Sequence, residues 1–376
     1  MKQIRTIALL LAVLMAFGAA FGCAGKKLAA KVGDREITVQ QLENSYDNSS
    51  MYAMYYGYAL DTAEGIESYQ DYLLDSMVSE QAKAYEARLA GVTLTDEEQA
   101  EAQKTATESY DSTYQSFVDA AEQSGSADVK AYAQKLFTDA LIQNGTTVSK
   151  LKKELLRDAE DAKLIEKHKE QLLSSVQMTP EELEAKFDEE LATQKELFEA
   201  DPAQYFTYES NATYGAGSPI LYTPAGMYRV KHILVEDETT ANDLKARLDA
   251  GEDFEALLTE FGTDSGMAGS PEGYLYGEGA NFVEEFKAAA ALLEKEGDVS
   301  EVTKSDYGYH ILKRYADEPA HEATYEEVKD TFDAYAQGAV DDETYQGIVD
   351  GWLADAAVVT RYPENYRFIG KSALEA

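Results

Sequence analysis

The sequence has little of several residue types, and each shortage excludes a kind of site. With 1 cysteine the chain forms no intramolecular disulfide and no multi-cysteine metal or iron–sulfur site, and 4 histidines leave little room for a histidine-rich metal centre. Lysine and arginine number 33 against 70 aspartates and glutamates, which gives a formal net charge of −37. Because phosphate binding requires clustered cations, this balance argues against nucleic acid as a partner.

The chain nevertheless contains enough apolar side chains for a substantial core. Hydrophobic residues make up 44% of the 376 residues, and 26 residues are tyrosine. This composition argues against wholesale disorder. The length exceeds that of one ordinary domain, so we expect two or three. Composition leaves enzyme, chaperone and binding protein open.

The first 22 residues have the pattern of a secretory signal peptide. Lys2 and Arg5 precede an uncharged, mostly apolar run over residues 6–22, which is short for a spanning helix of about 20 apolar residues. The run ends in Ala20-Phe21-Gly22-Cys23, which resembles a bacterial lipobox, and the resemblance implies lipidation at Cys23. We therefore expect a lipid-anchored protein on the extracytoplasmic face of the cell membrane. An uncleaved anchor with an incidental cysteine is the alternative.

Helix signals dominate the chain on both sides of a region of different composition. A threonine with Glu or Gln three residues later predicts helix starts at residues 38–41, 95–98, 179–182 and 324–327. We expect an N-terminal helical domain over residues 23–198, a Gly- and Pro-containing linker over 199–227, and a separate unit over 228–317. The amphipathic helix of residues 318–376 is expected to return to the N-terminal helices, followed by a tail, because it cannot bury its apolar face alone.

Residues 228–317 alternate between strand and helix patterns and contain two of the histidines. His232 lies in the first predicted strand and His310 in the last, with Asp264 in a loop between them. The candidate metal ligands are too few, and no short-spaced histidine pair is present. Nucleophile-elbow, phosphate-loop and dinucleotide motifs are also missing. From these residues alone, two core histidines bonded to backbone remain an alternative to a functional pair.

Five segments in order over about 90 residues resemble parvulin-type peptidyl-prolyl isomerases. The segments are Val230-Lys231-His232-Ile233-Leu234-Val235, Gly251-Glu252-Asp253-Phe254-Glu255-Ala256-Leu257 followed by Glu260-Phe261-Gly262-Thr263-Asp264, Phe282-Val283-Glu284-Glu285-Phe286-Lys287-Ala288-Ala289, Gly297-Asp298-Val299-Ser300-Glu301-Val302, and Tyr307-Gly308-Tyr309-His310-Ile311-Leu312. Together with the lipobox and the helical flanks, this layout resembles the PrsA-type foldase lipoproteins, which share a SurA-like architecture. The resemblance implies an α+β fold, in which a parvulin-like domain with a small antiparallel sheet is inserted into a mostly helical chaperone domain.

The resemblance also implies the residues of a site. The catalytic set would be His232, Asp264 and His310. Substrate-binding residues would be Phe282, Phe286, Leu275, Ser305 and Tyr307. No cofactor and no metal is implied.

The implied function is that of an extracytoplasmic, lipid-anchored foldase. It would catalyse cis-trans isomerisation of X–Pro peptide bonds and assist the folding of unfolded or newly secreted polypeptides that contain proline. The sequence is also compatible with a homodimer. The alternative is a non-catalytic holdase with a degenerate parvulin module, favoured by the departure from the family pattern at residues 271–276. A solute-binding lipoprotein would need a two-lobed α/β pattern, which the helix-rich first half does not have. Whether the tyrosine-rich segment 46–58 is core or groove is left undecided.

Overall fold

The computed structural model describes residues 27–144, 146–215 and 217–371. These residues form two compact units: the first takes the chain up to Val176 and again from Asp341, and the second is Gln177–Val340. The expected signal peptide of residues 1–22 and the lipidation site Cys23 lie outside the described residues. Within the described ranges, no helix combines the length and the apolar character needed to cross a membrane. The domain boundaries expected from the sequence stay a prediction.

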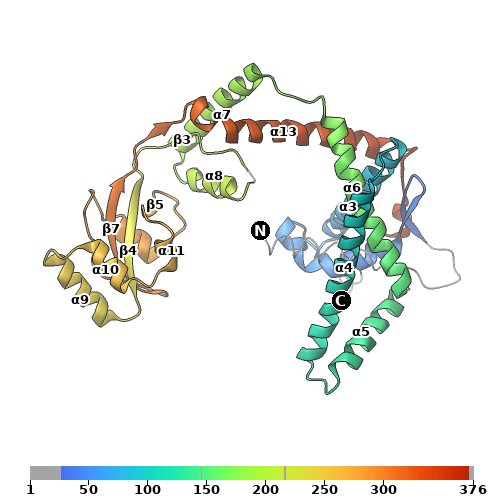
Figure 1. Ribbon diagram of the computed structural model, residues 1–376, viewed down its shortest axis with the longest axis horizontal. Helices are drawn as coiled ribbons and strands as arrows, with labels where there is room; N and C mark the ends of the chain where they lie inside the picture. The colour runs from blue at the N-terminus through green and yellow to red at the C-terminus, as the bar shows by residue number, and fades with distance from the viewer. Residues whose placement is uncertain (1–26, 145, 216, 372–376) are drawn as a thin grey trace. The chain divides into compact units, whose positions relative to one another are not determined.

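The first unit combines a small sheet with long helices (Figure 1). Strands β1 (Leu28–Val32), β2 (Arg35–Thr38) and β9 (Val359–Arg361) form an antiparallel sheet in the order β2-β1-β9. The helices and the short η1 follow in the order α2 (Val39–Ser49), η1 (Ser50–Tyr56), α3 (Ala63–Leu89), α4 (Asp96–Gln123), α5 (Val129–Gln143) and α6 (Val148–Leu173). Pairing of β9 with β1 brings the C-terminal end of the chain into the same core as its beginning, where Tyr366 and Ile369 pack with Leu42 and Leu74.

Three of the predicted helix starts have a full capping box in the structure, which confirms them. Thr38 and Gln41 form a full capping box at α2, and Thr95 and Glu98 form one at α4. A third capping box joins Thr179 to Glu182 at the start of α7 (Pro180–Ala200). Each box satisfies amide groups that the first turn of a helix leaves without an intrahelical partner, so these local residues define where the helices begin.

The second unit begins with α7 and contains structure where the sequence suggests a linker. Within residues 199–227 lie α8 (Gln204–Thr213) and β3 (Tyr222–Thr223), which pairs with β8 (His321–Glu322). Tyr205 is buried and its ring meets that of Phe198 edge-on at 5.7 Å. The apolar side chains of this segment are therefore packed into a local core, in spite of its Gly and Pro content.

Helix α13 (Tyr325–Ala354) contributes to both units, and each part has its own partner. In the second unit, Phe332 packs against Phe187 of α7 with the rings edge-on at 5.5 Å. In the first unit, Tyr345 and Val349 pack against Leu173 of α6. The apolar face of this helix is thus buried along its length, as the amphipathic pattern requires.

A four-stranded antiparallel sheet forms the centre of the second unit, in the order β5-β4-β7-β6. Its strands are β4 (Tyr228–Val235), β5 (Tyr274–Tyr276), β6 (Thr303–Ser305) and β7 (Gly308–Asp317). Four helices accompany it: α9 (Glu238–Asp249), α10 (Phe254–Phe261), α11 (Ser265–Ala268) and α12 (Glu284–Ala290). One face packs against α9 and α10 through Ile233 and Ile311, and the other packs against α12 through Val230 and Leu312. The predicted α+β fold, with this sheet inserted between two parts of a helical unit, is confirmed.

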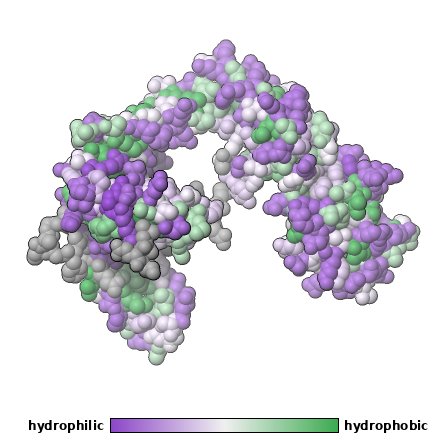
Figure 2. Space-filling model, turned by 180° about the vertical axis from the view of Figure 1, so that it is seen from behind, coloured by the Kyte–Doolittle hydropathy of each residue, from purple (hydrophilic) through white to green (hydrophobic). Residues whose placement is uncertain are grey.

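The surface reflects the charge of the sequence. On the face shown in Figure 2, hydrophilic side chains cover most of each unit and hydrophobic ones occur in small separate groups. Among the charged residues of the sequence, 70 are acidic and 33 are basic, so the charged part of the surface carries an excess of carboxylates.

Candidate functional site

The paired histidines come from the two central strands of the four-stranded sheet. In the antiparallel register of β4 and β7, His232 lies opposite Leu312, and Leu234 lies opposite His310. Residues two apart on a strand share a face, so both imidazoles lie on the side covered by α12, as diagonal neighbours. The Nδ1 atoms of the two rings are 3.1 Å apart and the rings stack at 5.2 Å. Both histidines are buried, with 4% of each exposed.

Glycine makes the approach of the two strands feasible at the start of β7. Gly308 has a φ of +131°, and a Cβ atom built there would lie 2.5 Å from the carbonyl oxygen of Val235. Any L side chain at this position would collide with the β4 backbone. Gly308 therefore sets how closely β7, and with it His310, approaches β4.

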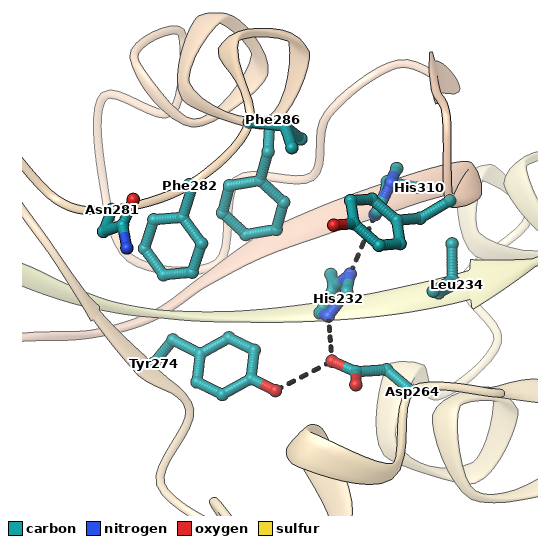
Figure 3. Close-up of a pocket in the computed structure, with 10 residues that line it drawn as sticks. His232, Leu234, Asp264, Tyr274, Asn281, Phe282, Phe286 and His310 are labelled. Atoms are coloured by element: carbon teal, nitrogen blue, oxygen red, sulfur yellow. Dashed lines mark hydrogen bonds and ion pairs between the residues drawn. The ribbon is translucent and has the colours of Figure 1, made fainter. Parts of the chain in front are cut away.

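Asp264 is brought to His232 by the turn between α10 and α11. The amide and hydroxyl of Thr263 both donate to the carbonyl of Leu234 at 2.9 Å, which ties this turn to the end of β4. Asp264 is the N-cap of α11, and its Oδ1 accepts from the amide of Gly266 at 2.9 Å. Its other oxygen, Oδ2, lies 2.7 Å from Nε2 of His232 and accepts from the hydroxyl of Tyr274 at 2.8 Å (Figure 3).

A consistent set of proton positions follows from these contacts. An ionised carboxylate only accepts, so Nε2 of neutral His232 carries the proton and its Nδ1 accepts. His310 then donates through Nδ1, and its Nε2 accepts from the hydroxyl of Ser305 at 2.7 Å. The assignment runs in one direction from Ser305 through both neutral imidazoles to Asp264. Every polar atom of the two buried rings has a partner, which stabilises the pair.

The pKa values of the three groups agree with this assignment. Burial lowers the pKa of His232, although the neighbouring Asp264 opposes the effect. Burial, reinforced by His232, lowers the pKa of His310 to about 4. Burial acts to raise the pKa of Asp264, but the hydrogen bonds from Tyr274, His232 and Gly266 outweigh it, and the net pKa is below the ordinary value. At neutral pH the site therefore holds two uncharged imidazoles and one carboxylate.

Aromatic rings form the wall above the histidines. Phe282 and Phe286 stack with centroids 4.6 Å apart, and Phe286 meets His232 edge-on at 5.2 Å and His310 edge-on at 5.9 Å. A cavity of about 300 Å³ opens between these rings and the histidines (Figure 3). It is lined by His232, Leu234, Asp264, Tyr274, Asn281, Phe282, Val283, Phe286, Tyr307 and His310. Its size and apolar walls suit one small ring-shaped side chain with a polar group beside it.

Most of the residues expected from the sequence meet in this cavity. His232, Asp264, His310, Phe282, Phe286 and Tyr307 all line it. Ser305 lies behind the cavity, where it accepts from the amide of Tyr307 at 3.1 Å and donates to His310. It therefore supports a histidine, and the structure does not place it as a substrate contact.

Leu275 does not lie with this set, which corrects the expected proline cup. It packs instead with Phe198, Tyr222 and Met227. Successive residues of a strand point to opposite faces, and in β5 the side chain of Tyr274 takes the cavity side. The sequence pattern did not reveal β5 as a strand, so this alternation was not available to the prediction.

Four cavity residues were not foreseen: Leu234, Tyr274, Asn281 and Val283. Leu234 could have been found, because it is two residues from His232 on a predicted strand and so shares its face. Tyr274 could not, because its role depends on the pairing of Tyr274 with Val230 and on the path of the Asp264 turn. In the described part of the chain, no group of three or more His, Cys, Asp or Glu side chains is placed to hold a metal ion.

Comparisons with known proteins identify related sequences for most of the chain. A family described as the PPIC-type PPIase domain matches residues 219–330, and a family described as the SurA-like N-terminal domain matches residues 2–136. The chain is 42% identical over 134 residues to the foldase protein PrsA of Geobacillus kaustophilus, a match that covers 35% of this chain and 46% of the relative. It is 29% identical over 252 residues to the foldase protein PrsA 3 of Bacillus cereus, covering 64% of this chain and 85% of the relative.

A solved structure with a similar sequence is NmPin, the parvuline of Nitrosopumilus maritimus. The identity is 36%, the match covers 25% of this chain and 100% of that chain, and the TM-score is 0.22. Among the curated relatives, the match to the Geobacillus protein spans about half of that protein's length, 46%.

Proposed function

We propose that this chain, in which residues 2–136 match a SurA-like N-terminal domain family and residues 219–330 match a PPIC-type PPIase domain family, is a foldase that catalyses cis-trans isomerisation of X–Pro bonds. The observation that carries the proposal is the cavity in which His232, His310 and Asp264 form a hydrogen-bonded floor beneath stacked Phe282 and Phe286. As the proposed catalytic residues, His232, Asp264 and His310 would face the amide, and the two phenylalanines would hold the proline ring.

The reaction requires neither a covalent step nor a cofactor. Its barrier of roughly 18–20 kcal/mol arises from amide resonance, which is lost as the bond twists. A site lowers the barrier when it binds the twisted amide better than either planar form. An apolar cavity holds the proline ring while the rest of the peptide rotates, and a fixed set of hydrogen-bonding groups in a low-dielectric site interacts with the carbonyl that has lost conjugation.

In this mechanism the histidines orient the floor and no proton has to move. Because the pKa of each imidazole is lowered, both stay uncharged at neutral pH and the cavity contains no cation to compete with the amide. The carboxylate of Asp264 fixes the tautomer of His232, and the hydroxyl of Ser305 fixes that of His310. In the proposed mechanism Ser305 therefore acts through His310, whereas Asp264 orients His232 and also lines the cavity itself.

We further propose that the foldase works outside the cytoplasm, anchored to the membrane by lipid at Cys23, and that its substrates are unfolded or newly secreted proline-containing polypeptides. The signal-like residues 1–22 and the lipobox-like sequence before Cys23 support this location. Incorporation of labelled fatty acid into the expressed protein, lost on Cys23→Ser, tests the anchor. Label that persists in the Cys23→Ser protein would contradict it.

The catalytic proposal is tested by NMR exchange spectroscopy on a short proline peptide with the full-length chain. The wild type should accelerate cis-trans exchange, and His310→Ala should lower the acceleration by about tenfold or more while the protein stays folded. Tyr214→Ala, which changes an exposed tyrosine of the same unit, serves as the matched control and should leave the rate unchanged. A folded wild-type chain that gives no acceleration would shift the function to that of a non-catalytic holdase.

A further inference from the structure

The first unit displays a group of large side chains that the isomerase site does not use. The tyrosine–methionine surface consists of Met51, Tyr52, Met54, Tyr55 and Tyr56 of η1 and Tyr72 of α3, all exposed. Met54 and Tyr55 are 85% and 87% exposed, and Ala53 is the one residue of η1 that is buried. Contiguous exposure of such side chains on a folded protein marks a surface for interaction.

This surface is held by an ordered series of rings that reaches the core. Tyr55 meets Tyr56 at 5.7 Å, and Tyr56 meets Tyr72 at 6.1 Å. The series continues to Tyr58 at 5.4 Å from Tyr72, and then to Tyr69 at 5.2 Å from Tyr58. Tyr69 is buried, and its hydroxyl donates to the carbonyl oxygen of Ser49, the last residue of α2. The exposed rings therefore stand on a fixed support and lose little conformational entropy on binding.

The stretch of sequence that carries this surface contains acidic residues and no basic ones. Between Arg35 and Lys83 the sequence contains 9 carboxylates and no lysine, arginine or histidine. Three of these carboxylates, Glu67, Asp71 and Asp75, form ion pairs with basic residues of the C-terminal segment. Three more flank η1 in the sequence and are exposed: Asp47, Asp61 and Glu64. Among the described residues, no cation pairs with any of these three.

We infer that the tyrosine–methionine surface binds segments of unfolded polypeptide that carry lysine or arginine among apolar residues. Tyrosine faces attract ammonium and guanidinium groups, and the flanking carboxylates add attraction of the same sign. Methionine side chains are flexible and polarisable, so the surface accommodates apolar residues of different shapes. The inference rests on the proposed function in one respect, that the protein acts on unfolded chains.

Charge also favours a cationic polypeptide over two other partners, a second copy of the chain and an anionic membrane. A second copy of the chain would bring another acidic surface and a formal charge of −37, so like charges would meet. An anionic membrane would repel the same carboxylates. A cationic, partly apolar polypeptide is the partner for which both the rings and the charges are complementary.

The test uses fluorescence anisotropy with the full-length chain and two labelled, proline-free peptides of equal length. The peptides share leucine and tyrosine positions, and one carries lysines where the other carries glutamates. We expect the lysine peptide to bind about tenfold or more tightly than the glutamate peptide at low salt, with the difference shrinking as salt is added. Because the peptides lack proline, the result does not depend on whether the parvulin site is active.

Three variants locate the binding. Tyr52→Ser/Met54→Ser/Tyr55→Ser should weaken binding of the lysine peptide by about tenfold. Asp47→Asn/Asp61→Asn/Glu64→Gln should remove most of the preference for lysine over glutamate. Leu89→Ser/Ile142→Ser, which changes two other exposed apolar side chains of the same unit, is the matched control and should bind as the wild type does. Circular dichroism confirms that each variant is folded, and proline-peptide exchange should be unchanged in all three.

Several results would overturn the inference. These are equal binding of both peptides by the wild type, undiminished binding by the folded Tyr/Met variant, and loss of binding in the Leu89/Ile142 control. A wild-type dimer that the Tyr/Met variant converts to a monomer would assign the surface to self-association instead. Binding to phosphatidylglycerol vesicles that the same variant abolishes would assign it to the membrane. Loss of isomerisation with binding intact would contradict the proposed catalysis alone.

Discussion

In the second unit the aromatic rings around the paired histidines pack against one another and against the sheet, whereas in the first unit the rings of η1 face solvent. Phe286 is 3% exposed and touches both imidazoles, while Tyr55 is 87% exposed and touches Tyr56. The two regions differ because a site for one proline ring needs an enclosed cavity, and a surface for varied polypeptide needs accessible, adaptable side chains. The number of aromatic residues in a region therefore does not indicate its function, whereas their burial distinguishes an enclosed site from an exposed binding surface.

The largest expected effect is the difference in stability between removing a buried ring of the cavity and removing an exposed ring of η1. Phe286→Ala should lower the free energy of unfolding of the second unit by about 3–5 kcal/mol and abolish isomerisation, because it leaves a cavity beside the buried histidines. Tyr55→Ala should change stability by no more than about 0.5 kcal/mol, because the side chain is exposed. Chemical denaturation of both variants measures the difference. Similar costs for the two substitutions would contradict the comparison.

The pH dependence of stability provides the next largest effect. The pKa of His232 is lowered, and that of His310 is lowered to about 4, so the folded unit binds fewer protons than the unfolded chain below the unfolded pKa of about 6.5. The free energy of unfolding is therefore unaffected by the titration of these histidines above about pH 6.5, and it declines as the pH falls toward their pKa values in the folded protein. We expect the free energy of unfolding of the second unit to decrease by about 1–2 kcal/mol between about pH 7 and pH 5.

Two substitutions separate the histidines that contribute to this decline. His310→Asn removes the histidine whose pKa burial lowers to about 4, and it should make the decline of the second unit shallower. His168, which is buried in the first unit against Trp352, also has a pKa lowered by burial. His168→Asn should therefore change the pH dependence of the first unit only. A decline that neither substitution alters would contradict the assigned pKa shifts.

A smaller effect distinguishes the cavity side of the four-stranded sheet from the opposite side, where Leu275 of β5 packs. Phe282→Ala should lower isomerisation of a proline peptide by about tenfold, because it removes half of the stacked pair that lines the cavity. Leu275→Ala should leave the isomerisation rate within about twofold of wild type, because its side chain packs on the opposite side of the sheet. Exchange spectroscopy compares the two at equal protein concentration. A larger loss for Leu275→Ala would restore Leu275 to the cavity.

The smallest expected effect concerns the groups that support the histidines. Tyr274→Phe removes the hydroxyl that donates to Asp264, and it should lower the free energy of unfolding by about 1 kcal/mol. The same change should raise the pKa of Asp264, since one of the hydrogen bonds that lowers it is lost. NMR titration of the Asp264 carboxyl measures the shift. An Asp264 pKa that stays where it is in the wild type would contradict the hydrogen bond from the Tyr274 hydroxyl to Asp264.

The sequence contained enough to predict the floor of the site and its main aromatic wall. The strand patterns around His232 and His310 placed both histidines, and the five parvulin-like segments added Asp264, Phe282 and Phe286. The prediction failed at residues 271–276, where three residues of strand carry too few alternating positions to be distinguished from a loop. Leu275 was assigned to the cavity for that reason, and Tyr274 was missed because its role depends also on its pairing with Val230 and on the turn that carries Asp264.

The sequence by itself determined the composition limits, the helix starts at its capping boxes and the α+β alternation of residues 228–317, because these depend on residues close together in the chain. Only the tertiary structure decided which imidazole nitrogen faces which partner, which face of β5 meets the cavity, and whether a tyrosine is buried or exposed. Each of these depends on the register between strands or on contacts between segments far apart in sequence. Tyr46 and Tyr55 lie on one continuous stretch, yet the first is 7% exposed and the second 87%, because packing of α2 on α3 covers Tyr46 and leaves Tyr55 of η1 exposed.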